Sequence, residues 1–155
     1  MIQRIQTLYL LAAALFGGLM FVLPLASFTT GADTFTLTAL GLRDAAGETV
    51  QPVIYLTVLL AAAVALPLVT VFLYKRRFVQ IRFCVAELVL LLGVGVLTGV
   101  YCYLCHRFFS GYYELYLSTF KVAVVFPLAA LVCDFLALRG VVRDEKLVRS
   151  LDRIR

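Results

Sequence analysis

Three residues near the end of an apolar segment have side chains that could bind a cofactor. Cys102, Cys105 and His106 form the pattern C-x-x-C-H, in which two thiols can attach haem while the adjacent His ligates the iron. The chain has no other His to complete that coordination, and Met1 and Met20 are its only thioethers. We therefore interpret the pattern as a coincidental match in an interfacial turn and expect no cofactor. Covalent haem and a disulfide between the two cysteines remain alternatives, whereas a zinc site lacks a fourth ligand.

Two carboxylates interrupt otherwise apolar segments, which makes them candidates for a charge site inside a membrane. Glu87 lies about one turn into its segment, where the positive end of the helix macrodipole and Arg82 can stabilise it. Asp134 lies about one turn from the inner end of the last apolar segment and needs a cation such as Arg139. A structural ion pair is therefore the first interpretation of Asp134. The alternative is that Glu87 and Asp134 face each other and form a proton or cation site.

The composition requires the elements that carry these residues to lie in a membrane. Of the 155 residues, 63% are hydrophobic and 15% are charged, and the mean hydropathy is +1.01. These values exclude a disordered chain, a disulfide-stapled secreted module and a large soluble catalytic domain. Long uncharged stretches predict an all-α membrane protein, a four-helix transmembrane bundle with spans near 7–28, 52–74, 83–105 and 118–138. We expect residues 1–138 to form the transmembrane domain and residues 139–155 a basic cytoplasmic tail.

The distribution of positive charge predicts the orientation of the four spans. Eleven of the fourteen Lys and Arg residues fall on the side that holds both termini, and only Arg43, Arg107 and Lys121 fall on the other side. Because the connecting segments are short, the positive-inside rule predicts a multi-pass protein of a bacterial inner membrane with both termini in the cytoplasm. The cations then lie at membrane edges. Anionic inner-leaflet lipid is therefore the expected partner, and nucleic acid is not.

Small residues on the third predicted span are candidates for close helix packing. Gly95 and Gly99 lie four residues apart on one helix face, and such pairs let two backbones approach each other in a membrane. Packing within the bundle is the first interpretation, and a weak homodimer or docking of a membrane-protein partner is the alternative. Three prolines lie inside predicted spans, where each is expected to bend its helix: Pro24, Pro67 and Pro127.

The outer segment between the first two spans, residues 29–51, predicts a small β-hairpin. Residues 34–39 alternate threonine with apolar residues, which is the period of a strand with one apolar face. A turn is expected within residues 43–48, and residues 49–50 can return as a second strand. Because a lone two-stranded ribbon is marginally stable in water, we expect Phe35 to rest on the bundle or on a partner.

The basic tail predicts an amphipathic helix. At helical spacing its cations gather on one side and its apolar residues on another, which suits a helix lying on anionic headgroups or docking on a protein. The candidate contact residues are Arg143, Lys146, Arg149 and Arg153. Gly140 is a candidate for the bend at which the tail leaves the membrane. The alternative is that the tail is a solvated extension of the fourth span.

Both ends of the chain resemble a known family. Two segments carry the resemblance. The N-terminal segment MIQRIQTLYLL, with the motif MIQRIQ, and the C-terminal segment RDEKLVRSLDRIR are similar to the motifs found at the two ends of the family's sequences. The family is a Bacteroidota group of four-span inner-membrane proteins, classed as a domain of unknown function. The resemblance covers the whole chain in length and span count. It implies no assigned activity, cofactor or catalytic residue.

Three hypotheses about function follow. The first is a non-enzymatic scaffold or accessory subunit of a membrane assembly, because the sequence contains no pattern typical of catalysis. The second is a small transporter or channel-like protein that uses Glu87 and Asp134 as an intramembrane acid pair. The third is a membrane redox protein that uses the C-x-x-C-H motif. We expect no catalytic residue and no metal site.

Overall fold

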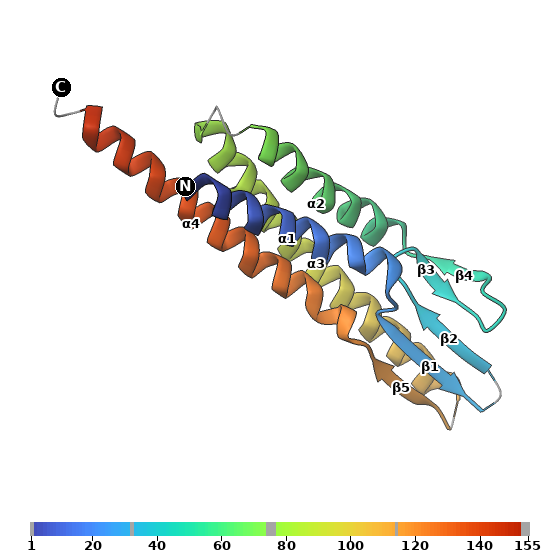
Figure 1. The fold of residues 1–155 in the computed structure, drawn as a ribbon. Coiled ribbons are helices and arrows are strands. Elements are labelled where there is room, and N and C mark those ends of the chain that lie inside the picture. The colour runs from blue at the N-terminus through green and yellow to red at the C-terminus, as the bar shows by residue number, and fades with distance from the viewer. Residues whose placement is uncertain (1, 32, 74–76, 114, 153–155) are drawn as a thin grey trace.

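The computed structural model describes residues 2–31, 33–73, 77–113 and 115–152, and it shows four long helices attached to one sheet (Figure 1). The helices are α1 (Ile2–Val22), α2 (Ile54–Phe72), α3 (Arg77–Tyr112) and α4 (Phe126–Asp152), and a 3-10 turn at Val122–Val125 precedes α4. Four helical stretches are long and apolar enough to cross a membrane. The prediction of four long apolar helices is therefore confirmed.

The outer surfaces of the helices are apolar. Large side chains such as Val58, Val89, Val96 and Leu128 are each more than half exposed. In water such a surface would drive association, whereas in a bilayer it is the surface that faces lipid.

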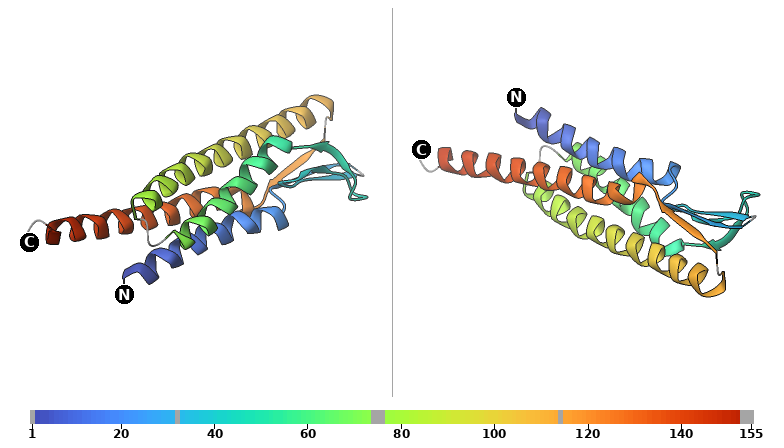
Figure 2. Two further views of the ribbon diagram at one scale, coloured as in Figure 1. Left: turned by 90° about the horizontal axis from the view of Figure 1, so that it is seen from above. Right: turned by 90° about the horizontal axis from the view of Figure 1, so that it is seen from below.

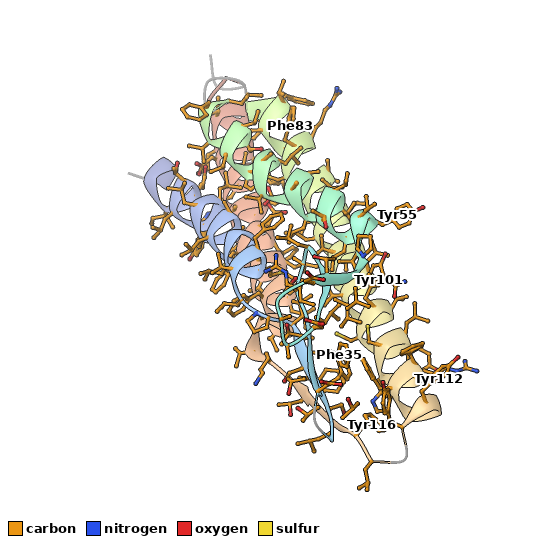
Figure 3. The ribbon with its side chains drawn as sticks, turned by 90° about the vertical axis from the view of Figure 1, so that its right-hand side faces the viewer. Phe35, Tyr55, Phe83, Tyr101, Tyr112 and Tyr116 are labelled. Carbon is orange, nitrogen blue, oxygen red and sulfur yellow. The ribbon has the colours of Figure 1, made fainter. Side chains whose placement is uncertain are left out.

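Consecutive helices run antiparallel, so that both termini lie at one end of the molecule and the sheet lies at the other (Figures 1 and 2). Phe83 lies near the end that holds the termini, whereas Phe35 and Tyr116 lie at the sheet end (Figure 3). Helix α1 packs against α2 and α4, and α3 packs against the same two helices. We call the end with the termini the inner end and the end with the sheet the outer end.

The outer end carries a five-stranded antiparallel sheet in place of the predicted two-stranded hairpin. Its strands are β1 (Ala26–Thr30), β2 (Asp33–Leu37), β3 (Gly41–Arg43), β4 (Thr49–Pro52) and β5 (Leu117–Phe120), in the order β4-β3-β2-β1-β5. Strand β1 begins in the predicted first span, and β5 lies at the start of the predicted fourth span. The hairpin prediction was therefore wrong in extent, because the end of the first predicted span and the start of the fourth also join the sheet.

Proline explains why two of the predicted spans are too long. Helix α1 stops at Val22 because Pro24 has no N–H to donate and disfavours helical geometry at the preceding residue. The chain then continues as β1, held to β5 by backbone pairing that begins at Ala26 and Phe120. Pro127 lies in the first turn of α4, where no helical hydrogen bond is lost. Among the described helices, only α2 contains a proline in its interior, Pro67.

Glycines mark the tightest helix contacts, at other positions than the predicted pair. A Cβ added at Gly17 of α1 would lie 2.7 Å from Val64 of α2, and one at Gly93 of α3 would lie 3.0 Å from a leucine of α2. A Cβ at Gly95 would only reach ordinary contact with α4, and one at Gly99 would meet open space. Within the bundle, the close approaches therefore lie at Gly17 and Gly93 rather than at Gly95 and Gly99.

The C-terminal segment is not a separate helix, because α4 continues without interruption to Asp152. Gly140 is helical and does not mark a bend. A Cβ at Gly140 would lie 3.0 Å from Gln6 of α1, so the glycine allows α1 and α4 to approach each other. The Gln6 side chain also donates a hydrogen bond of 2.6 Å to the carboxylate of Asp144. The end of α4 extends past the other helices (Figure 1), as the alternative prediction of an extended fourth span required.

Candidate functional site

The two intramembrane acids lie on the buried faces of neighbouring helices. Glu87 on α3 and Asp134 on α4 are both 0% exposed. Buried residues recur every three or four positions on α3, at Cys84, Glu87 and Leu91, and the same spacing on α4 includes Asp134. The heptad-like spacing that normally presents apolar side chains to a bundle core therefore presents two carboxyl groups instead.

The acid pair separates the two apolar clusters of the bundle core. The larger cluster lies on the outer side and includes Leu91, one turn beyond Glu87, and Ala130, one turn from Asp134. The smaller cluster lies on the inner side and consists of Leu10, Cys84 and Ala137. The pair therefore forms a polar layer between two apolar ones.

Glu87 lies roughly 15 Å along the helix axis from the start of α3 at Arg77. Both acids are fully buried inside the bundle, where water cannot easily solvate a charge, and the carboxyl groups depend on one another and on nearby side chains.

Glu87 and Asp134 are close enough for their charges to interact, and Cys84 is close enough to interact with both acids. None of the four carboxyl oxygens has a hydrogen-bond donor among the described residues. Two ionised carboxylates are both acceptors and cannot bond to each other without a proton between them. One proton would convert their repulsive contact into a hydrogen bond.

Two of the three cations expected near Asp134, Arg82 and Arg139, do not reach the acids, and the side chain of the third, Arg77, lies outside the described residues. Arg82 and Arg139 are both exposed on the outside of the bundle. Each lies five residues from the acid on its own helix, and five residues place two side chains about 140° apart around a helix axis. The candidate charge site in the described structure therefore contains Glu87 and Asp134 without Arg82 or Arg139.

The C-x-x-C-H residues lie inside α3 and not in an interfacial turn. Cys102 is buried, Cys105 is half-buried, and both thiols are free. The hydroxyl of Tyr116 lies 3.2 Å from Nε2 and 3.3 Å from Nδ1 of His106. Cys102 belongs to the outer apolar cluster, and Cys105 packs against it. These contacts give all three side chains a packing role.

The proximity of Cys84 to the acids was not predicted from the sequence. Its position three residues before Glu87 places both side chains on one helix face and is the signal that was available. Of the four predicted tail contacts, the side chains of Arg143 and Lys146 are exposed. The side chain of Arg149 and the whole of Arg153 lie outside the described residues.

The described residues contain no group of three or more His, Cys, Asp or Glu side chains arranged to hold a metal ion. What the acid pair can do chemically is bind a proton and change its charge.

Comparison with known proteins gives a family over nearly the whole length of the chain. A search of curated proteins finds no match. The model of the domain of unknown function DUF4293 matches residues 2–154. The chain, with its four apolar helices and buried acid pair, therefore belongs to the DUF4293 family.

Proposed function

We propose that this protein is a non-enzymatic inner-membrane protein whose helical bundle binds and releases a proton at Glu87 and Asp134. The observation that carries the proposal is the proximity of two fully buried carboxyl groups that have no hydrogen-bond donor among the described residues. An intramembrane acid is a functional candidate by default, and two facing acids strengthen that inference.

Electrostatics favours a proton as the ligand. Removing an ionised carboxylate from water costs several kcal/mol even after the protein relaxes, and two adjacent ones also repel each other. A shared proton halves the charge of the pair and supplies the missing donor. A second proton would make the pair neutral.

Changes in protonation would act on the packing of α3 against α4, since one acid lies on each helix. Loss of the shared proton leaves two negative charges in contact, which favours separation of the helices. The pair thus couples proton binding to the shape of the bundle, as a small transporter or a proton-regulated membrane subunit requires.

The proposed location is the inner membrane of a bacterium, with both termini in the cytoplasm. Two observations support this orientation: the termini share one end of the molecule, and most Lys and Arg residues belong to segments near that end (Figures 1 and 2). The resemblance of the chain ends to a Bacteroidota family supports the bacterial inner membrane.

A second candidate function is a scaffold or accessory subunit that binds another membrane protein. The open sheet favours it, because β4 and β5 are edge strands with unpaired outer sides. In β5, Leu117 and Phe120 are 67% and 55% exposed. An exposed apolar edge is a template for pairing with a strand of a partner.

Proton movement in proteoliposomes tests the first candidate. The protein is reconstituted with a pH-sensitive dye inside the vesicles, and a pH step is applied outside. We expect faster equilibration than in empty vesicles, lost in Glu87→Gln and in Asp134→Asn. The control is Asp33→Asn, which neutralises an exposed acid of the sheet and should behave as wild type.

Equilibration at the rate of empty vesicles would contradict proton transport. Affinity purification from mild detergent then tests the second candidate. A stoichiometric membrane partner, lost when Leu117 and Phe120 are replaced by Lys, would support the scaffold. Recovery of the chain alone would count against it.

A further inference from the structure

The inner end of α4 carries an open groove that is separate from the acid pair. The groove has a volume of about 770 Å³, and its lining combines four apolar and three basic side chains: Phe135, Leu138, Val142, Leu147, Arg139, Arg143 and Lys146. All seven belong to α4, at positions three or four apart that share one helix face. Asp134 faces the core, whereas Phe135, the next residue, is 52% exposed.

The length of the groove matches the depth of one lipid leaflet. Phe135 is adjacent in sequence to Asp134, and Lys146 lies roughly 16 Å further along the helix, toward the inner end. Half of a bilayer hydrocarbon core is about 15 Å thick.

Polarity changes along the groove in the direction that a phospholipid requires. Phe135 and Leu138 form its deep part, and Arg143 and Lys146 form its end near the surface. The side chains of Arg139, Arg143 and Lys146 are exposed. The surface end therefore offers positive charge to an external anion.

We propose that this groove binds one anionic phospholipid of the inner leaflet. Its phosphate contacts Arg139, Arg143 and Lys146, and one acyl chain lies along Phe135, Leu138 and Val142. The charge complementarity and the matching depth select an anionic lipid over a zwitterionic one and over a soluble phosphate.

Binding of phosphatidylglycerol to the full-length protein tests the proposal. Native mass spectrometry of the detergent-solubilised protein would measure its affinity beside that of phosphatidylcholine with the same acyl chains. We expect phosphatidylglycerol to bind more tightly by about tenfold or more, since each cation near the surface contributes about 1 kcal/mol. Equal affinities for the two lipids would overturn the proposal.

A charge-matched pair of variants locates the site. The first replaces Arg139, Arg143 and Lys146 with Gln, and the second replaces three exposed cations elsewhere, Arg82, Arg107 and Lys121, with Gln. We expect the first variant to lose about 10- to 100-fold in affinity for phosphatidylglycerol and the second to lose less than about threefold. Equal losses would show a general effect of net charge and would overturn the assignment.

Two measurements on the unchanged protein keep the test independent of how the variants fold. Raising the salt concentration should weaken binding of phosphatidylglycerol, because exposed charges are screened. Glycerol phosphate, which has the anionic headgroup without acyl chains, should not compete. Binding that is insensitive to salt, or full competition by glycerol phosphate, would contradict a lipid that uses both parts of the groove.

Discussion

The outer end of the molecule and the middle of the bundle each contain fully buried side chains, but these are arranged in opposite ways. At the outer end, Phe109 of α3 stacks on Phe28 of β1 with ring centroids 5.0 Å apart, and its centroid lies 5.2 Å from that of Phe35. The backbone of Leu25 joins this region by donating to Leu37 and accepting from Lys121, at 2.8 and 2.9 Å. In the middle, four carboxyl oxygens have no donor among the described residues.

The difference distinguishes residues that stabilise the fold from residues that we propose to be functional. Around Phe109 the outer end has stacked apolar rings and paired backbone groups of Leu25. The acid pair breaks the rule that buried polar groups are satisfied, and such exceptions are expected at functional sites. We therefore expect substitutions in the two regions to change stability in opposite directions.

The largest expected effect is at the outer end. Phe109→Ala should lower the free energy of unfolding in mixed micelles by about 3–5 kcal/mol, because it removes a buried ring and leaves a cavity. Phe108→Ala is the matched control, since Phe108 is 55% exposed and should change stability by less than about 1 kcal/mol. Similar losses in the two variants would mean that the aromatic stack does not hold the sheet to α3.

The acid pair should respond in the opposite sense. Combining Glu87→Leu with Asp134→Val should raise the free energy of unfolding by about 1–4 kcal/mol, because apolar side chains replace two poorly satisfied buried acids. The control combines Asp33→Val with Glu48→Leu, which removes two exposed acids and should change stability by less than about 0.5 kcal/mol. A loss of stability in the core variant would assign the acids a structural role.

Substitutions at two glycines compare a tight helix contact with an open position. Gly17→Ala should destabilise the bundle by about 1–3 kcal/mol, since the added Cβ would lie 2.7 Å from the stiff Val64 side chain. Gly99→Ala should stabilise α3 by about 0.5–1 kcal/mol, since the added methyl meets open space. Equal shifts in thermal midpoint would show that α1 and α2 do not approach through Gly17.

The smallest expected effect is at the contact between Tyr116 and His106. Tyr116→Phe removes only the hydroxyl and should cost about 0.5–1.5 kcal/mol of unfolding free energy. Tyr112→Phe is the control, because Tyr112 is 76% exposed and should show no measurable change. A nitrogen chemical shift of His106 that stays the same in Tyr116→Phe would refute the contact itself.

The number of helices could be predicted from the sequence, but the sheet could not. Charged residues are costly inside a bilayer and are therefore rare in membrane spans. Long stretches of sequence without charged residues thus locate the helices. Hydropathy does not distinguish an apolar strand from the end of an apolar helix. Strands β1 and β5 were therefore assigned to spans, although Pro24 was a signal that α1 had to stop. Their pairing joins segments far apart in sequence, which no local pattern encodes.

The acid pair could be predicted in part. The spacing of buried residues around Glu87 and Asp134 makes a face-to-face arrangement one of two interpretations. The angle of about 140° between Glu87 and Arg82 was already enough to argue against an ion pair on the same helix.

The most direct test of a shared proton is the infrared spectrum of the protein reconstituted in lipid at neutral pH. A protonated carboxyl group has a carbonyl stretch that an ionised carboxylate lacks. The account predicts such a band in the wild-type protein, absent when Glu87→Gln and Asp134→Asn are combined, and unchanged in Asp33→Asn. A wild-type spectrum without the band, or a band that persists in the double variant, would contradict a proton held between α3 and α4.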